Sequence, residues 1–220
     1  SLSGISLAQM GRFDEAMTAL QQAEKLAERV RADDVVATVC GNMANVHMFE
    51  HRYDQALALA ERSVGLHEGL GSGHGLAVAL ATLGQICVRL GDLTRAESVL
   101  KRALAVRSPI QFHETTGAVF DTLAQIHLIR GDYQLATDYL GQAGDEYGAY
   151  GRQTSRWYEW SVRVLNARLA LKRGALDDAV TLSTEIERTG APPYTQQAAL
   201  SAAAAPTAPG ALPAAEQRPA

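Results

Sequence analysis

The chain has 220 residues, of which 47% are hydrophobic, 6% aromatic and 20% charged, and its formal net charge at pH 7 is −4. This length allows one or two domains with a buried core, and the composition argues against global disorder. The acidic charge balance argues against a nucleic-acid-binding surface, which normally needs a basic face.

The sequence also predicts a setting away from membranes and from secretion. No apolar run approaches the roughly 20 residues that cross a bilayer, and the N-terminus lacks the layout of a signal peptide. Cys40 and Cys87 are far apart and form no CxxC pair, which favours a reduced, cytoplasmic environment. The basic residues are nearly all arginine and alanine is abundant, which is typical of a GC-rich bacterial genome.

Five segments share one pattern. In chain order they read GRFDEAMTALQQAE, HRYDQALALAERSV, GDLTRAESVLKRAL, GDYQLATDYLGQAG and GALDDAVTLSTEIE. An aromatic residue or Leu follows a break at spacings of 40, 40, 40 and 43 residues, and an alanine stands three positions later in every copy. With the residues four and seven positions further on, these alanines form one face of a helix, and their small size allows a second helix to approach closely. The aligned alanines are Ala16, Ala56, Ala96, Ala136 and Ala179.

A second amphipathic segment precedes each break. It carries a small residue seven positions before the break, namely Gly4, Ala44, Gly84, Ala124 or Ala167. Gly11, Gly91, Gly131 and Gly174 stand at four of the breaks, where a left-handed residue is expected to end a helix, and His51 stands at the other. Each unit is therefore predicted to be a helix, a tight turn and a second, antiparallel helix.

This pattern resembles the tetratricopeptide repeat family, and LGQICVRLGDLTRAESVLKRAL carries the resemblance almost throughout. The 40-residue period, longer than the family's usual 34, is similar to that of spindle-orientation adaptors, kinesin light chains and many bacterial signalling and transcription-regulator proteins. The resemblance covers residues 1–190 and implies an all-α, right-handed superhelical solenoid of antiparallel helix pairs. The expected units are approximately 1–32, 33–71, 72–109, 110–150 and 151–190.

Two structures are possible for the residues that follow these units. Residues 191–205 are predicted to form a capping helix, and residues 206–220 a poorly ordered Ala/Pro-rich tail. The alternative is a truncated sixth repeat, because GALPAAEQ copies the pattern of GDLTRAES. The opening SLSGISLAQMG already looks like the middle of a helix, so we expect the chain to be a fragment of something longer.

The resemblance implies that the first helix of each unit lines a concave groove. Polar residues share columns along these helices, and Asn and Gln side chains can both donate and accept hydrogen bonds from a bound peptide. Arg and Lys could bind acidic side chains or a terminal carboxylate. The alternative is that these residues are ordinary solvated positions of amphipathic helices. The predicted partner-binding residues are Asn42, Asn45, Phe49, Thr82, Gln85, Arg89, Asp121, Gln125, Arg168 and Lys172.

Two further features invite a functional reading. His47, Cys87 and His127 occupy one column, but repeats stack on the order of 10 Å apart, so the three cannot converge on one metal ion and are predicted to be packing residues. Trp157, Tyr158 and Trp160 form an aromatic group that is either an interface or a filler for the irregular 43-residue spacing.

No Walker-type loop, GxSxG, HExxH or CxxC motif is present, so we expect no catalysis, cofactor or metal. The predicted function is a non-catalytic scaffold that binds a protein or peptide in its groove. The alternative is a regulatory sensor domain of a larger bacterial regulator or signalling protein. Self-association through an uncapped terminal repeat is also open.

Overall fold

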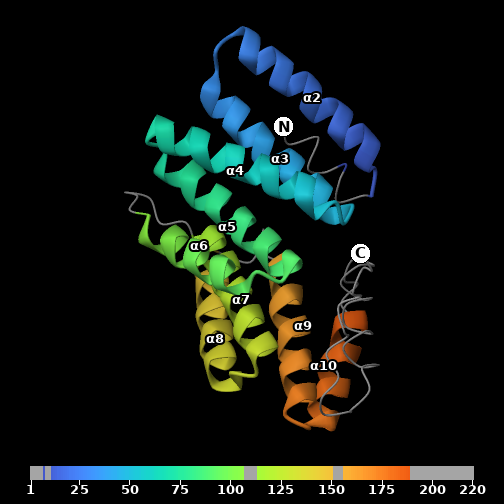
Figure 1. Ribbon diagram of the computed structural model, residues 1–220. Helices are drawn as coiled ribbons and strands as arrows, with labels where there is room; N and C mark the ends of the chain where they lie inside the picture. The colour runs from blue at the N-terminus through green and yellow to red at the C-terminus, as the bar shows by residue number, and fades with distance from the viewer. Residues whose placement is uncertain (1–6, 8–10, 107–112, 151–155, 189–220) are drawn as a thin grey trace, which may run out of the picture.

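The computed structural model describes residues 7, 11–106, 113–150 and 156–188. Helices follow one another through these ranges with only short connections, which confirms the predicted all-α fold (Figure 1). The helices are α2 (Phe13–Arg29), α3 (Asp33–Phe49), α4 (Tyr53–Leu70), α5 (Gly73–Leu90), α6 (Leu93–Ala105), α7 (His113–Arg130), α8 (Tyr133–Tyr150), α9 (Arg156–Lys172) and α10 (Leu176–Arg188). The expected capping helix at 191–205 and the tail at 206–220 lie outside the described residues.

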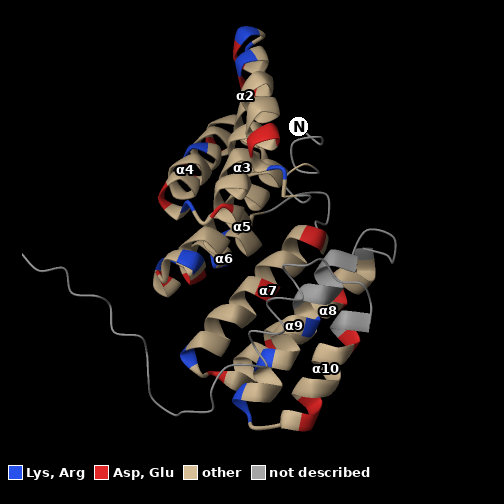
Figure 2. Ribbon diagram, turned by 90° about the vertical axis from the view of Figure 1, so that its right-hand side faces the viewer, with Lys and Arg blue, Asp and Glu red and all other residues tan. Residues whose placement is uncertain are grey.

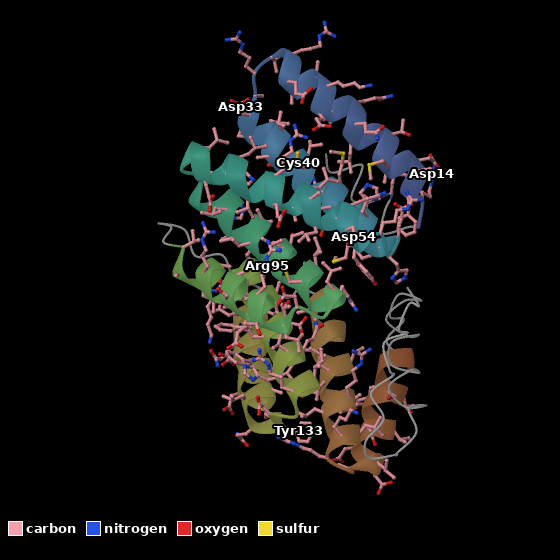
Figure 3. The ribbon with its side chains drawn as sticks, in the orientation of Figure 1. Asp14, Asp33, Cys40, Asp54, Arg95 and Tyr133 are labelled. Carbon is pink, nitrogen blue, oxygen red and sulfur yellow. The ribbon has the colours of Figure 1, made fainter. Side chains whose placement is uncertain are left out.

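The helices pack as sequential antiparallel pairs, α3 with α4, α5 with α6, α7 with α8, and α9 with α10. Helix α2 is the second helix of the first unit and packs on α3. Asp14 and Asp54 mark the starts of α2 and α4 on one side of the stack, whereas Asp33 marks the start of α3 on the other side (Figure 3). First and second helices therefore run in opposite directions, as predicted.

A residue in the left-handed region ends the first helix of each pair. Gly91 has a φ of 82°, and its N–H donates to the carbonyl of Val88 at 3.1 Å. His51 takes the same place in the second unit with a φ of 60°, although its Cβ disfavours that region. The left-handed conformation predicted at these breaks is thus confirmed, even where glycine is absent.

The alanine column fills the space between paired helices. Each of its members is almost completely buried, which confirms that the small residues mark the helix–helix contacts. The exposed fractions are 0% for Ala16, Ala56 and Ala96, 1% for Ala136 and 5% for Ala179. The paired helices α5 and α6 also approach closely at Gly84, where a Cβ would stand 2.5 Å from Cδ2 of Leu100.

Helix α5 is the centre of the largest core cluster and contacts α3, α4, α6 and α7. It is also the one described helix whose length and composition would suit a membrane span. This was not expected from the sequence. Half of the span is buried inside the protein, so neighbouring helices account for its apolar character.

Carboxylates near the breaks can cap the second helices. Asp92 does so, because its side chain accepts a hydrogen bond from the backbone N–H of Arg95 at 3.0 Å. Asp14 and Asp54 instead lie in the first turns of α2 and α4, where their charge faces the positive end of the helix dipole without a capping hydrogen bond.

Long ion pairs join successive units across the second helices. Arg62 of α4 reaches Glu24 of α2 at 2.6 Å, and α6 is joined to α4 and to α7 in the same way. The further pairs are Arg95–Glu61, Arg102–Glu68 and Arg130–Glu97. Hydrogen bonds from Lys101 and Arg130 lower the pKa of Glu97 to about 2. Acidic and basic residues are accordingly interspersed over the described helices (Figure 2).

One buried histidine fixes the contact between α4 and α5. The side chain of His67 is 5% exposed, and a Cβ at Gly75 would stand 2.2 Å from its Cε1. Burial lowers the pKa of His67, and the charge of His74 acts in the same direction. Burial therefore favours the neutral form of the ring.

Candidate partner-binding groove

The first helices of the pairs form the inner row of a curved stack. Within the described residues, α3 contacts α5, α5 contacts α7 and α7 contacts α9, whereas the second helices α2, α4, α6, α8 and α10 do not approach one another as closely. The second helices are joined instead by the long side chains of the ion pairs. In a curved stack the closer row is the inner one, so α3, α5, α7 and α9 line the concave side.

Three amide side chains occupy equivalent places on this inner row. Asn45 of α3, Gln85 of α5 and Gln125 of α7 are each half-buried. Within the described part of the chain, none of these amides takes part in a hydrogen bond. A half-buried amide normally finds a partner because its desolvation is costly. These groups can therefore donate to and accept from the backbone of a segment that enters the groove.

The other predicted residues differ in what they offer a partner. Asn42 and Phe49 are half-buried, and Phe49 also packs against the core between α2 and α3. Arg89 is exposed. Thr82 and Asp121 are only 8% and 7% exposed, so they present little surface to a bound segment.

The remaining predicted residues come from α9. Arg168 is half-buried on the inner row and Lys172 is exposed one turn later. The backbones of Trp157, Tyr158 and Trp160 belong to α9, but their side chains lie outside the described part of the structure.

The pKa of Arg168 is lowered from its ordinary value. Burial lowers the pKa of Arg168, and the positive charge of Arg89 lowers it further. The sequence placed the two arginines in different columns two units apart, so it did not predict this influence of one charge on the other.

The histidine and cysteine column serves packing at two of its three positions. Cys87 is 1% exposed inside the core of α5 and α6, and burial raises the pKa of its thiol. His127 is 6% exposed and stacks on Tyr139 with ring centroids 5.4 Å apart. His47 lies 3.2 Å from Glu50 at the end of the same helix. Among the described residues, no group of three His, Cys, Asp or Glu side chains is arranged to hold a metal ion.

Comparison with known proteins supports the repeat. Two models of the tetratricopeptide repeat match the sequence, one over residues 35–108 and the other over residues 2–29. No protein in the curated set matches the chain.

Solved structures share the fold at low sequence identity. A putative kinesin light chain from Podospora anserina with nearly identical TPR-like repeats matches with a TM-score of 0.58 and 18% identity, over 84% of this chain and 92% of that one. BtubC (BKLC) from P. vanneervenii matches with a TM-score of 0.63 and 14% identity, over 97% of this chain and 84% of that one. These likenesses bear on the fold alone. The repeat matches and the stacked helix pairs identify a tetratricopeptide repeat domain, which is generally a protein-interaction module.

Proposed function

We propose that this chain is a non-catalytic scaffold that holds a segment of a partner protein against α3, α5 and α7. The observation that carries this proposal is the column of Asn45, Gln85 and Gln125, which are half-buried on the inner row without a hydrogen bond inside the described structure. An extended or helical segment lying across the three helices would supply the missing partners from its own backbone and polar side chains.

Core packing explains why these amides can serve binding without serving the fold. The contacts that hold the pairs together come from the alanine column and its buried neighbours, such as Leu80 and Leu123, which are 0% exposed. The amides stand outside these clusters. Their removal should therefore leave stability nearly unchanged while it weakens binding.

The test begins with a selection of binding peptides from a random displayed library against the natural chain. The dissociation constants of the selected peptides are then measured by fluorescence anisotropy for a variant in which Asn45, Gln85 and Gln125 are all changed to Ala. We expect the variant to bind at least about tenfold more weakly, because each lost hydrogen bond contributes about 0.5–1.5 kcal/mol.

A matched control removes three exposed amides from the second helices, with Gln22, Gln55 and Gln142 changed to Ala. This control should keep its affinity, and both triple variants should melt within a few degrees of the natural chain. Equal affinity of the two triple variants would place binding elsewhere. A large loss of stability in the groove variant would make its amides structural and end the proposal.

A further inference from the structure

The side chain of His67 lies at the contact between two successive units. His67 belongs to the last turn of α4, and α4 packs against α5, the first helix of the next unit (Figure 1). A Cβ at Gly75, in the first turn of α5, would stand 2.2 Å from Cε1, 2.3 Å from Nδ1 and 2.8 Å from Nε2 of the ring. The imidazole therefore rests directly on the backbone of α5. We call this contact between the last turn of α4 and the first turn of α5 the α4–α5 joint.

The ring of His67 is buried without a hydrogen bond at one of its nitrogens. Its side chain is 5% exposed, and within the described structure no protein group forms a hydrogen bond with Nδ1. The Nδ1 atoms of three other histidines, His47, His113 and His127, lie 3.2, 2.7 and 3.3 Å from a carboxylate oxygen. Protonation strengthens such a pair, whereas at His67 it places a charge in a buried site with no hydrogen-bonded carboxylate.

The charges around His67 do not compensate for its burial. Among the described residues, His74 of α5 disfavours the charged ring and Asp34 of α3 favours it, but Asp34 is exposed and its influence is screened by solvent. On α4 itself, Glu68 is paired with Arg102 of α6. The C-terminus of α4 favours a positive charge and the N-terminus of α5 disfavours it, so the two helix dipoles oppose each other. Burial is the largest influence, and it lowers the pKa of His67.

The first turn of α5 is the element that can respond to this charge. It begins with Gly73 and contains Gly75, and glycine is a poor helix former. Its cap is a hydrogen bond of 3.3 Å from the backbone N–H of Gly75 to the hydroxyl oxygen of Ser72. Further along the helix, Leu80 is 0% exposed in the largest core cluster. The first turn can therefore fray while the rest of α5 stays packed.

We propose that the α4–α5 joint is sensitive to pH: when His67 takes up a proton from solvent, its ring leaves the backbone of Gly75 for water, and the first turn of α5 frays. The joint lies between α3 and α5, which carry Asn45 and Gln85 of the groove. Opening of the joint therefore alters how these two amides are held relative to each other and weakens binding. This last consequence rests on the function proposed above, whereas the opening of the joint does not.

The first experiment follows amide hydrogen exchange by mass spectrometry on the natural chain, with rates corrected for the intrinsic effect of pH. Protection of residues 71–78 should fall at least about tenfold between about pH 7.5 and about pH 5.5. The preceding joint is a matched internal control, because Ala27 stands one repeat before His67, is 4% exposed and does not titrate. Residues 33–38, at the start of α3, should change less than about twofold over the same range.

Variants assign the change to one ring. His67→Gln and His67→Leu should each remove the loss of protection, and the second is included in case the first does not fold. His113→Gln, which removes a histidine paired with Glu146 at 2.7 Å, should retain the loss. Equal protection of residues 71–78 at the two pH values, an equal loss at residues 33–38, or the same loss in both His67 variants would each overturn the inference.

The second experiment measures binding of the selected library peptides by fluorescence anisotropy over the same pH range, with peptides that contain no His, Asp or Glu. The natural chain should bind at least about fivefold more weakly at the lower pH, because the apparent affinity falls with the fraction of closed joints. His67→Leu should change less than about twofold. An unchanged affinity together with an opened joint would overturn the link to the groove. Peptides that do not depend on Asn45, Gln85 and Gln125 would overturn the proposed function, while hydrogen exchange would still decide the joint.

Discussion

A methyl group added at Gly84 tests how the units are held together. Its Cβ would stand 2.5 Å from Cδ2 and 2.6 Å from Cγ of Leu100, and contacts below 3.0 Å force a shift. Leu100 is 0% exposed, so it has no free space into which to turn. In Gly84→Ala the two helices must separate or the leucine must leave its rotamer.

The size of the effect follows from two opposing contributions. Overpacking of a filled core costs about 1–3 kcal/mol, whereas replacing glycine by alanine inside a helix gains about 1 kcal/mol. We therefore expect Gly84→Ala to lower the free energy of unfolding by about 0–2 kcal/mol. Leu100→Ala, which leaves a cavity, should cost about 3–5 kcal/mol.

The double variant Gly84→Ala/Leu100→Ala distinguishes packing from propensity. The preceding unit already carries alanine at both equivalent places, Ala44 and Ala60, and both are 0% exposed within the same core cluster. The new methyl group should fill part of the cavity, so the double variant should cost at least about 1 kcal/mol less than the sum of the single variants.

The assay is urea denaturation of the four proteins, followed by far-ultraviolet circular dichroism. Additivity within about 0.5 kcal/mol, together with a stabilising Gly84→Ala, would show that the close contact between α5 and α6 does not limit the core. The steric reasoning for this contact would then be refuted.

Three further predictions concern single sites. Gly91→Ala should destabilise the protein by about 1 kcal/mol because the φ of 82° at this position strains any residue with a Cβ. Gly141→Ala lies on an open helical surface of α8 and should instead stabilise the protein by about 0.5–1 kcal/mol. Urea denaturation measures both changes. The pKa of Glu97 is lowered to about 2, so the stability that it provides is complete above its unfolded pKa and is lost as the pH falls toward 2. Glu97→Gln should flatten that part of a plot of melting temperature against pH. The pKa of His67 is lowered, so the folded state binds fewer protons than the unfolded state. The free energy of unfolding should therefore decline as the pH falls through the usual histidine range, near about 6.5. His67→Leu should reduce this decline, and an unchanged decline would assign it to other groups.

Much of the fold could be predicted because the same residue pattern recurs in five units. A single alanine, such as Ala56 or Ala96, is weak evidence for a buried position. The same residue at the same place in each unit indicates one buried helix face, and these alanines are buried in the structure. The left-handed turns were predictable for the same reason. His51 adopts the conformation of the glycines that it replaces, which shows that the stacked pairs override the preference of the single residue.

Contacts between units could not be predicted from the sequence, because they depend on side-chain shape and on how successive units stack. One such contact is the packing of His67 of α4 against Gly75 of α5, where a Cβ would stand 2.2 Å from Cε1 of the ring. The ion pair from Arg130 to Glu97 likewise joins helices that sequence spacing did not relate.

The candidate site likewise contains residues that the sequence predicted and an interaction that it did not predict. The repeat alignment predicted that Asn45, Gln85 and Gln125 lie in one row, because equivalent positions on stacked helices form a row. It did not predict that the charge of Arg89 lowers the pKa of Arg168, because the two residues belong to different columns two units apart.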